Sequence, residues 1–384
     1  MPVSNNFRHQ QYSAERPDSV YKLVQADFPP QPESQEFAEI FRQFGKRLAP
    51  KYDSIYLIHG TFVGGDALGW NEQLSRRWPN AASKLTELGK LIVDKASGQS
   101  GNFTAEYARF FHDSIAEHSG HELDVRLFHW SGENTHAARC RAAIKFLANL
   151  LTHRAVLHVD TIRPLVFCHS HAGNVLALVS NLLAAPDETR NEFLRLVEPT
   201  FSHETAEQEI FSRVSSVLRE ATVREVISLD IVTLGTPIRY GWDTGGFDQL
   251  LHFVHHHPRA GKPEYLATIP KLGTELVTLA HGDFIQQLGI ATTNFMPFLF
   301  DRKLVKAENR LGEFLQGNID HSDFLERLRL GMRVPHDGTT LLVAYDDNHG
   351  LARKIAGHAI YTRPEWLSFH VRETTNEFAA ENQK

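Results

Sequence analysis

The sequence IRPLVFCHSHAGNVLALVSNLLAA, at residues 162–185, carries the clearest structural signal in the chain. Residues 162–170 form a short apolar run, which is typical of a buried parallel strand. Residues 172–185 continue directly into an apolar helix pattern. Only a sharp turn separates the two, and Ser170 occupies it. We therefore expect Ser170 at the carboxyl end of a buried strand.

Strand and helix patterns alternate on both sides of this stretch. Further strands are predicted at 54–60, 123–130, 224–237, 276–280 and 340–345, and further helices at 72–95, 103–118, 135–153, 187–222 and 364–378. This alternation predicts an α/β fold with a mostly parallel central sheet and helices on both faces. Binding and catalytic sites of such sheets form at the carboxyl ends of the strands.

The N-terminal 50 residues have a different composition from the rest. Residues 1–50 are polar, carry the sequence PPQPE at 29–33, and predict an extended arm with one short helix near 33–47. Residues 51–384 predict a single α/β domain, since large folds of this class often run as one domain. Insertions at about 187–222 and 284–335 are expected to form helical caps over a pocket.

Composition excludes several classes of function. The net charge of −6 gives no electrostatic footprint for nucleic acid or an anionic membrane. No apolar run reaches the roughly 18 residues of a membrane span, and the N-terminus lacks the apolar region of a secretory signal. Two cysteines, Cys140 and Cys168, provide no disulfide framework, which favours a reducing compartment. We expect a cytoplasmic protein without a transmembrane segment.

The turn at Ser170 resembles the site of an activated nucleophile. Enzymes that expose a serine between a strand and a helix usually carry Gly-x-Ser-x-Gly, because bulky neighbours would clash in the sharp turn. Here Cys168 and Ala172 replace the glycines, both residues are small, and Gly173 adds room. The alternative role for Ser170 is a plain helix N-cap.

Acyl transfer at Ser170 would need two N–H donors aimed at the developing oxyanion. One is expected from the residue after the nucleophile, here the backbone of His171. The other is expected from the loop after an early strand, where Gly60 precedes Thr61 and allows close approach. The alternative for Gly60 is an ordinary turn that ends a strand.

A serine nucleophile also needs a histidine base and a carboxylate that orients it. The base should lie between the last strand and the last helix, which favours His358, with His349 as the alternative. Asp283 follows an apolar run and a glycine and fits the end of the penultimate strand. Asp346 and Asp347, at the end of 340–345, are the rivals. His255, His256 and His257 are expected to be surface or loop residues.

Three segments in the expected order resemble the α/β-hydrolase superfamily, and more closely its lipase-like and esterase-like members. They are LIHGTF at 57–62, FCHSHAGN at 167–174 and VTLGTPIRYGW at 232–242. The resemblance covers about residues 53–378 in patches and departs from the pattern at Cys168 and Ala172. It implies a triad of Ser170, Asp283 and His358, with backbone donors from Thr61 and His171.

The sequence therefore predicts a serine hydrolase that cleaves a carboxylic ester through an acyl-enzyme. An acyltransferase with the same triad and a non-catalytic binding protein of this fold are the alternatives. No metal or cofactor is expected, since His169 and His171 flank Ser170 in different directions. The expected partner is a small-molecule or lipid ester. The apolar run 291–300 would line an acyl site or contact a lipid surface, unless it is buried cap core.

Overall fold

The structure of the chain is a computed structural model. It describes residues 6–61, 102–201, 205–219, 223–267, 282–291, 302–317, 323–346 and 357–381. The predicted helix at 72–95, the predicted strand at 276–280 and nearly all of the apolar run 291–300 lie outside the described residues.

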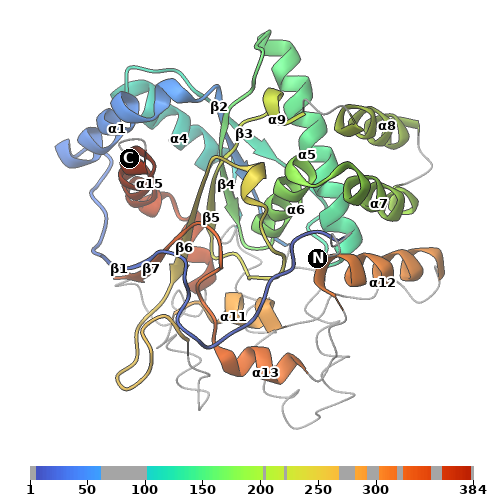
Figure 1. Cartoon of the computed structure of the whole chain (residues 1–384). Coiled ribbons are helices and arrows are strands. Elements are labelled where there is room, and N and C mark those ends of the chain that lie inside the picture. Colours follow the sequence, from blue (N-terminus) through green and yellow to red (C-terminus); the bar gives the residue numbers. More distant parts are fainter. Residues whose placement is uncertain are drawn as a thin grey trace.

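One seven-stranded sheet organises the described residues, and all its pairings are parallel (Figure 1). Its strand order is β1-β7-β6-β5-β4-β2-β3. The strands are β1 (Tyr21–Ala26), β2 (Ser54–Ile58), β3 (Asp124–Phe128), β4 (Pro164–His169), β5 (Asp230–Leu234), β6 (Gln249–His255) and β7 (Thr339–Tyr345). The predicted α/β class with a parallel central sheet is confirmed at this level.

The two faces of the sheet carry separate apolar cores because successive side chains of a strand point to opposite faces. In β4, Val166 and Cys168 belong to one core, whereas Leu165 and Phe167 belong to the other. All four are buried. Burial on both faces explains why the central strands are continuous apolar runs in the sequence.

Helices cover both faces (Figure 1). The first core also contains residues of α5 (His136–Leu157), α6 (Ala172–Ala184), α7 (Asp187–Val197), α8 (Thr205–Arg219), α9 (Val223–Val226) and α12 (Arg302–Gln316). The second contains residues of α1 (Gln35–Arg47), α4 (Ala105–His118) and α15 (Leu367–Glu381). The remaining described helices include α11 (Phe284–Ala291), α13 (Asp323–Leu330) and the 3-10 helix η4 (Gly357–Thr362).

The N-terminal segment is more integrated than the predicted polar arm of residues 1–50. Its strand β1 pairs with β7 at the edge of the sheet, and α1 buries Phe41 and Phe44 in the second core. Ser34 caps α1 by accepting from the Phe37 N–H at 3.1 Å. The predicted helix near 33–47 corresponds to α1, whereas the strand was not anticipated.

Strand β6 also differs from the expectation. His255 ends this strand and His256 follows it, and both are buried, at 5% and 0% exposure. The expectation of a surface or loop position is therefore wrong for His255, whereas His256 is buried in the segment after the strand and His257 is half-buried. Burial holds the pKa of His256 at about 3, with a smaller contribution from Arg333, so it is neutral at pH 7. A neutral imidazole tolerates burial much better than a charged one.

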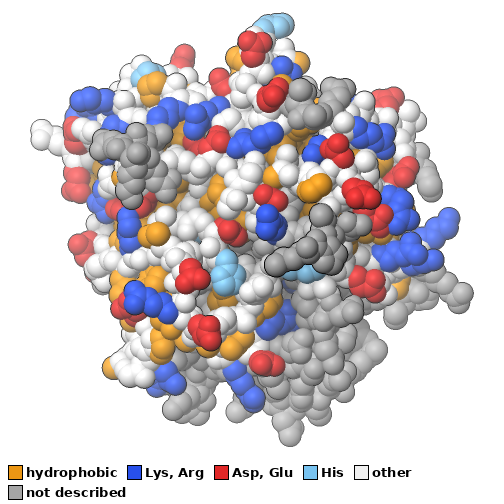
Figure 2. Space-filling view, viewed as in Figure 1, with side chains coloured by type: hydrophobic (Ala, Val, Ile, Leu, Met, Phe, Trp, Pro, Cys, Tyr) orange, Lys and Arg blue, Asp and Glu red, His pale blue; other side chains and the backbone are white. Residues whose placement is uncertain are grey.

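The face in Figure 2 shows acidic and basic side chains interspersed, with no large area of one sign among the residues coloured there. Among the described helices, none is long and apolar enough to cross a membrane.

Cys140 and Cys168 are both buried and free. The predicted cap insertions at 187–222 and 284–335 contain α7, α8, α11, α12 and α13, and their role as a cap stays a prediction.

Candidate active site

Ser170 sits in a strained turn between β4 and α6. Its φ is +55°, in the left-handed region that side chains other than glycine rarely adopt. Its N–H donates to the Leu234 carbonyl at 2.9 Å, and its carbonyl accepts from the Gly173 N–H and from Thr236 Oγ1. These bonds hold the turn from both sides, so the serine is fixed at the carboxyl end of the sheet.

Small residues allow the surrounding segments to approach Ser170 closely. A Cβ added at Gly60 would lie 2.6 Å from the Cβ of Ser170 and 3.3 Å from its Oγ. A Cβ added at Gly173 would lie 2.1 Å from Thr236 Oγ1. The first contact brings the loop after β2 against the serine, and the second brings the start of α6 against the loop after β5.

Asp283 and His358 form a buried pair at the same end of the sheet. The His358 Nδ1 donates to Asp283 Oδ2 at 2.6 Å. The backbone N–H of Asp283 donates to the carbonyl of His255, which anchors the aspartate at the end of β6. The buried Nε2 of His358 has no hydrogen-bond partner among the described residues. The pair therefore presents one free imidazole nitrogen.

The Asp283 carboxylate is fully buried yet ionised. Its Oδ2 also accepts from Tyr361 Oη at 3.1 Å, and its Oδ1 accepts from the Gln286 N–H at 2.9 Å. Burial raises the pKa of Asp283, but His358 and Arg333 outweigh burial and lower the pKa to about 2. Arg333 donates to the backbone carbonyl of Asp283 at 2.5 Å. Asp283 thus stays negative beside the imidazole across the physiological pH range.

Two contacts bring Ser170 and the Asp283–His358 pair into one place. A Cβ added at Gly235, next to Leu234, would lie 3.0 Å from Asp283 Oδ2, and Leu234 itself holds the Ser170 N–H. The ring of His169 lies 4.6 Å from the ring of His358, measured between centroids, and its Nε2 donates to the His358 carbonyl at 3.0 Å. His169, just before the turn, therefore contacts His358, and Gly235, next to the residue that holds the Ser170 N–H, lies against Asp283.

The peptide between Gly60 and Thr61 is oriented by His59. The Trp130 N–H donates to His59 Nε2 at 3.2 Å, so the Nδ1 carries the proton and donates to the Gly60 carbonyl at 2.7 Å. A trans peptide directs its carbonyl and N–H to opposite sides. The Thr61 N–H therefore points away from the His59 ring, while Gly60 rests against Ser170.

His171 is the residue at the start of α6, where backbone N–H groups lack helical partners. Burial holds the pKa of its imidazole well below the usual range, and the positive charges of Arg139 and Arg239 add to this effect. The neutral Nδ1 accepts from Asn174 Nδ2 at 3.4 Å. The side chain is thus neutral, and its backbone N–H lies immediately after the candidate nucleophile.

Of the alternative residues for base and acid, the structure describes Asp346, which does not join this cluster. Asp346 is exposed at the end of β7, where its N–H donates to the Ala26 carbonyl. Asp347 and His349 lie outside the described residues. Of the acids weighed from the sequence, Asp283 is the one that the structure bonds to His358.

Three contacts of this cluster were not anticipated from the sequence: Tyr361 on Asp283, Arg333 on the Asp283 backbone, and His169 on the His358 backbone. Tyr361 lies three residues after His358 in η4, a spacing that stacks side chains in a 3-10 helix. That spacing is the one local signal, because the contacts of Arg333 with Asp283 and of His169 with His358 join residues far apart in the sequence.

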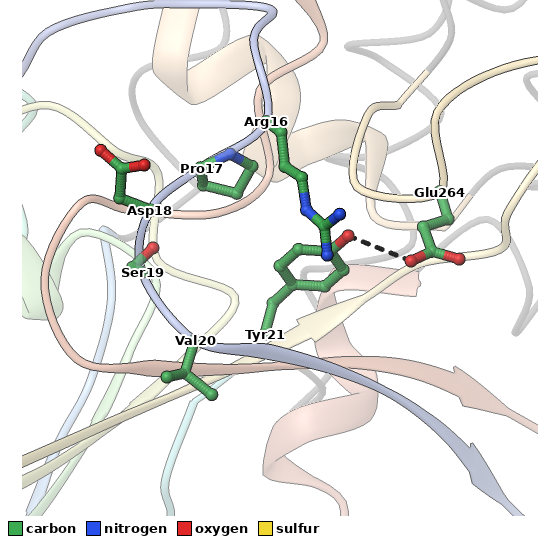
Figure 3. Close-up of a pocket in the computed structure, with 7 residues that line it drawn as sticks. All are labelled: Arg16, Pro17, Asp18, Ser19, Val20, Tyr21 and Glu264. Carbon is green, nitrogen blue, oxygen red and sulfur yellow. Dashed lines mark hydrogen bonds between the residues drawn. The ribbon is translucent and has the colours of Figure 1, made fainter.

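A surface pocket of about 510 Å³ lies elsewhere, beside the start of β1 (Figure 3). The Tyr21 hydroxyl donates to Glu264 Oε1 at 3.0 Å across it. Its lining consists of Arg16, Pro17, Asp18, Ser19, Val20, Tyr21 and Glu264. None of these residues contacts Ser170, Asp283 or His358, so the pocket is separate from the candidate active site.

Comparison of the chain with protein-family models, with curated proteins and with solved structures found no match. A function is therefore inferred from the residues and geometry of the site.

Proposed function

We propose that this protein is a serine hydrolase of the α/β-hydrolase fold that cleaves carboxylic esters through an acyl-enzyme on Ser170. The observation that carries the proposal is the buried Asp283–His358 pair, whose free Nε2 lies at the same end of the sheet as the strained Ser170. A nucleophile, a base and an orienting carboxylate are the three groups that activated serine chemistry needs.

The fold supports the same proposal. In α/β-hydrolases the nucleophile, the acid and the histidine follow one another in chain order. Here Ser170 follows β4, Asp283 is anchored at the end of β6, and His358 comes after β7. The sharp strand-to-helix turn with a non-glycine positive φ is the geometry of a nucleophile elbow.

In the proposed reaction, Ser170 Oγ attacks the ester carbonyl carbon while His358 Nε2 takes its proton. Asp283 stabilises the imidazolium that forms, and Tyr361 and the Gln286 N–H keep the carboxylate in place. His358 returns the proton to the leaving alcohol, which leaves an acyl group on Ser170. A water that loses its proton to His358 then releases the acid and restores the serine.

The negative charge on the carbonyl oxygen is assigned to the backbone N–H groups of Thr61 and His171. His59 supports this role by holding the Gly60 carbonyl, which turns the Thr61 N–H away from its ring. Removing a single oxyanion donor in a serine enzyme reduces the rate by about 10²–10³-fold.

Labelling with a fluorophosphonate probe tests the proposal directly, because such probes react with activated serines. We expect wild type and Ser368→Ala to be labelled and Ser170→Ala not to be. Ser368 is a matched control, since it is fully buried in α15 and its hydroxyl has no hydrogen-bond partner within the described chain. A p-nitrophenyl ester series then defines the acyl length. Folded wild-type protein that resists the probe and every ester would favour a non-catalytic binding protein.

A further inference from the structure

Two buried guanidinium groups in the described structure lack a counter-ion. Arg239 is 2% exposed and Arg327 is 6% exposed. Within the described part of the chain, Nε and Nη1 of Arg239 and Nε and Nη2 of Arg327 are buried and have no hydrogen-bond partner. Arg333 differs, because it donates to Asp283 and Gln286. Arg239 and Arg327 thus offer donors that the described residues leave unused.

The two groups belong to one cluster around the loop after β5. Arg327 lies 5.4 Å from the centre of the Tyr12 ring, and the Tyr12 hydroxyl donates to the Ile238 carbonyl at 3.1 Å. Arg139 lies over the ring of Tyr240 and donates to its hydroxyl at 2.8 Å. Aromatic rings therefore face Arg327 and Arg139, but no ion pair links Arg239 or Arg327 to a carboxylate among the described residues.

Buried charges of like sign are unfavourable unless an opposite charge joins them. Burial, together with the charges of Arg139 and Arg327, lowers the pKa of Arg239 to about 10. Arg239 nevertheless stays protonated at pH 7, as guanidinium groups do. A protein cannot relieve this arrangement by deprotonation, and an anion that enters the cluster would relieve it.

The loop after β5 connects the cluster to the turn at Ser170. Thr236 Oγ1 donates to the Ser170 carbonyl, and Asn174 Nδ2 donates to the Pro237 carbonyl at 2.9 Å. Arg239 follows Thr236 by three residues, so their Cα atoms are at most about 11 Å apart. A small molecule can span that distance between an ester carbon and a charged group.

We propose that Arg239 and Arg327 bind an anionic group, a carboxylate or a phosphate, carried by the ester substrate. Guanidinium groups recognise both oxyanions through paired N–H donors. The inference rests on the proposed function for the ester, but the anion site itself does not require catalysis. The substrate class is therefore an ester with an acidic group a few bonds from the scissile carbonyl.

Anion binding is tested first without turnover. Inorganic phosphate and succinate are added separately to the full-length Ser170→Ala protein at constant ionic strength, and thermal unfolding is followed. We expect at least one anion to raise the Tm by at least about 2 °C. Adding Arg239→Met should abolish the rise without lowering the Tm of the anion-free protein, because an unpaired buried charge is removed. The anion that acts identifies the group.

Two further variants keep this test decisive. Arg195→Met is the matched control, because Arg195 is exposed and pairs with Glu192; it should leave the anion response intact. Arg327→Met tests the same cluster from α13 if Arg239→Met fails to fold. No response of the Tm to either anion, or a response unchanged in both cluster variants, would overturn the site.

The preference of the enzyme for a charged over an uncharged ester then tests whether the anion site takes part in the reaction. The ratio of kcat/KM for p-nitrophenyl hemisuccinate to that for p-nitrophenyl butyrate should fall about 10- to 100-fold in Arg239→Met and stay constant in Arg195→Met. Labelled Ser170 with an unchanged ratio would overturn the inference and leave the hydrolase proposal standing. An anion response without labelling would support the site and reject the hydrolase.

Discussion

Ser170 and His158 share an unusual backbone conformation in very different surroundings. Within the described chain they are the non-glycine residues with positive φ, at +55° and +54°. His158 is exposed and ends α5, where a left-handed residue closes a helix in the common way. Ser170 is 7% exposed, and Gly60, Thr236 and Leu234 crowd it.

The two positions therefore differ in what surrounds the left-handed residue: at His158 it only ends a helix, and at Ser170 it is packed on several sides. A left-handed residue other than glycine costs about 1–2 kcal/mol at either position. At His158 glycine would serve as well, because a helix C-cap requires only the left-handed backbone conformation and the residue is exposed. At Ser170 the side chain lies against Gly60, at the same end of the sheet as the Asp283–His358 pair. Strain therefore marks function only where packing fixes it.

The largest effect is expected at Ser170 itself. Both Ser170→Ala and Ser170→Gly should lose about 10⁴- to 10⁶-fold in ester hydrolysis, since the nucleophile is gone. Glycine should also remove the backbone strain, so Ser170→Gly should be more stable than Ser170→Ala by about 1 kcal/mol. Urea unfolding of the two inactive variants measures that difference. Equal stability would mean that the turn is not strained.

Asp283→Asn should come next, with a loss of about 10⁴-fold in kcat, because an amide cannot stabilise the imidazolium of His358. This substitution also has a consequence for stability. The folded-state pKa of Asp283, about 2, is below its ordinary value of 3.8. Its contribution, about 2 kcal/mol, is therefore present above about pH 4 and is lost as the pH falls toward 2.

Urea unfolding of wild type and Asp283→Asn at pH 7, 4 and 3 measures this contribution. Buried neutral histidines such as His256 and His370 also weaken the fold in acid, because burial holds the pKa of each at about 3. Both chains share that loss, so the difference between them isolates Asp283. A difference that stays constant from pH 7 to pH 3 would show that His358 does not stabilise the ionised carboxylate.

Gly60→Ala should reduce activity by about 10²-fold, since its Cβ would lie 2.6 Å from the Cβ of Ser170. Gly120→Ala is the matched control. Gly120 has a φ of +72° with no heavy atom within 4 Å of an added Cβ, so its substitution introduces strain without a clash. We expect both variants to lose stability and only Gly60→Ala to lose activity, as measured by ester hydrolysis and thermal unfolding. Full activity in Gly60→Ala would separate the loop after β2 from the site.

The turn at Ser170 could be predicted from sequence because its signal is local. An apolar run, a serine and an apolar helix follow one another directly, so β4, the turn and α6 needed no tertiary information. The parallel sheet followed from the alternation of such patterns. Chain order predicts Asp283 and His358, together with the apolar run and glycine before Asp283 and the last strand and helix on either side of His358, and the structure brings these two residues together.

The missed elements lack a local signal. The strand β1 lies at an edge of the sheet, where water replaces one neighbour, so YKLVQA shows no continuous apolar run. His255 and His256 suggested a surface because histidine is polar, yet both are buried beside β7. Arg239 and Arg327 are the strongest case, since charged residues predict exposure and their burial depends on the packing of distant segments.

The smallest effect is expected at His158, and it completes the comparison with Ser170. His158→Gly should raise the free energy of unfolding by about 1 kcal/mol, because glycine adopts the left-handed conformation of this helix cap without strain. Glycine also enlarges the conformational freedom of the unfolded chain, which offsets part of the gain. Ester hydrolysis should not change, since His158 is exposed at the end of α5. Two results together would contradict the role of Ser170: a loss of activity in His158→Gly, and no gain in stability of Ser170→Gly over Ser170→Ala. The positive φ at Ser170 would then no longer support its role as nucleophile.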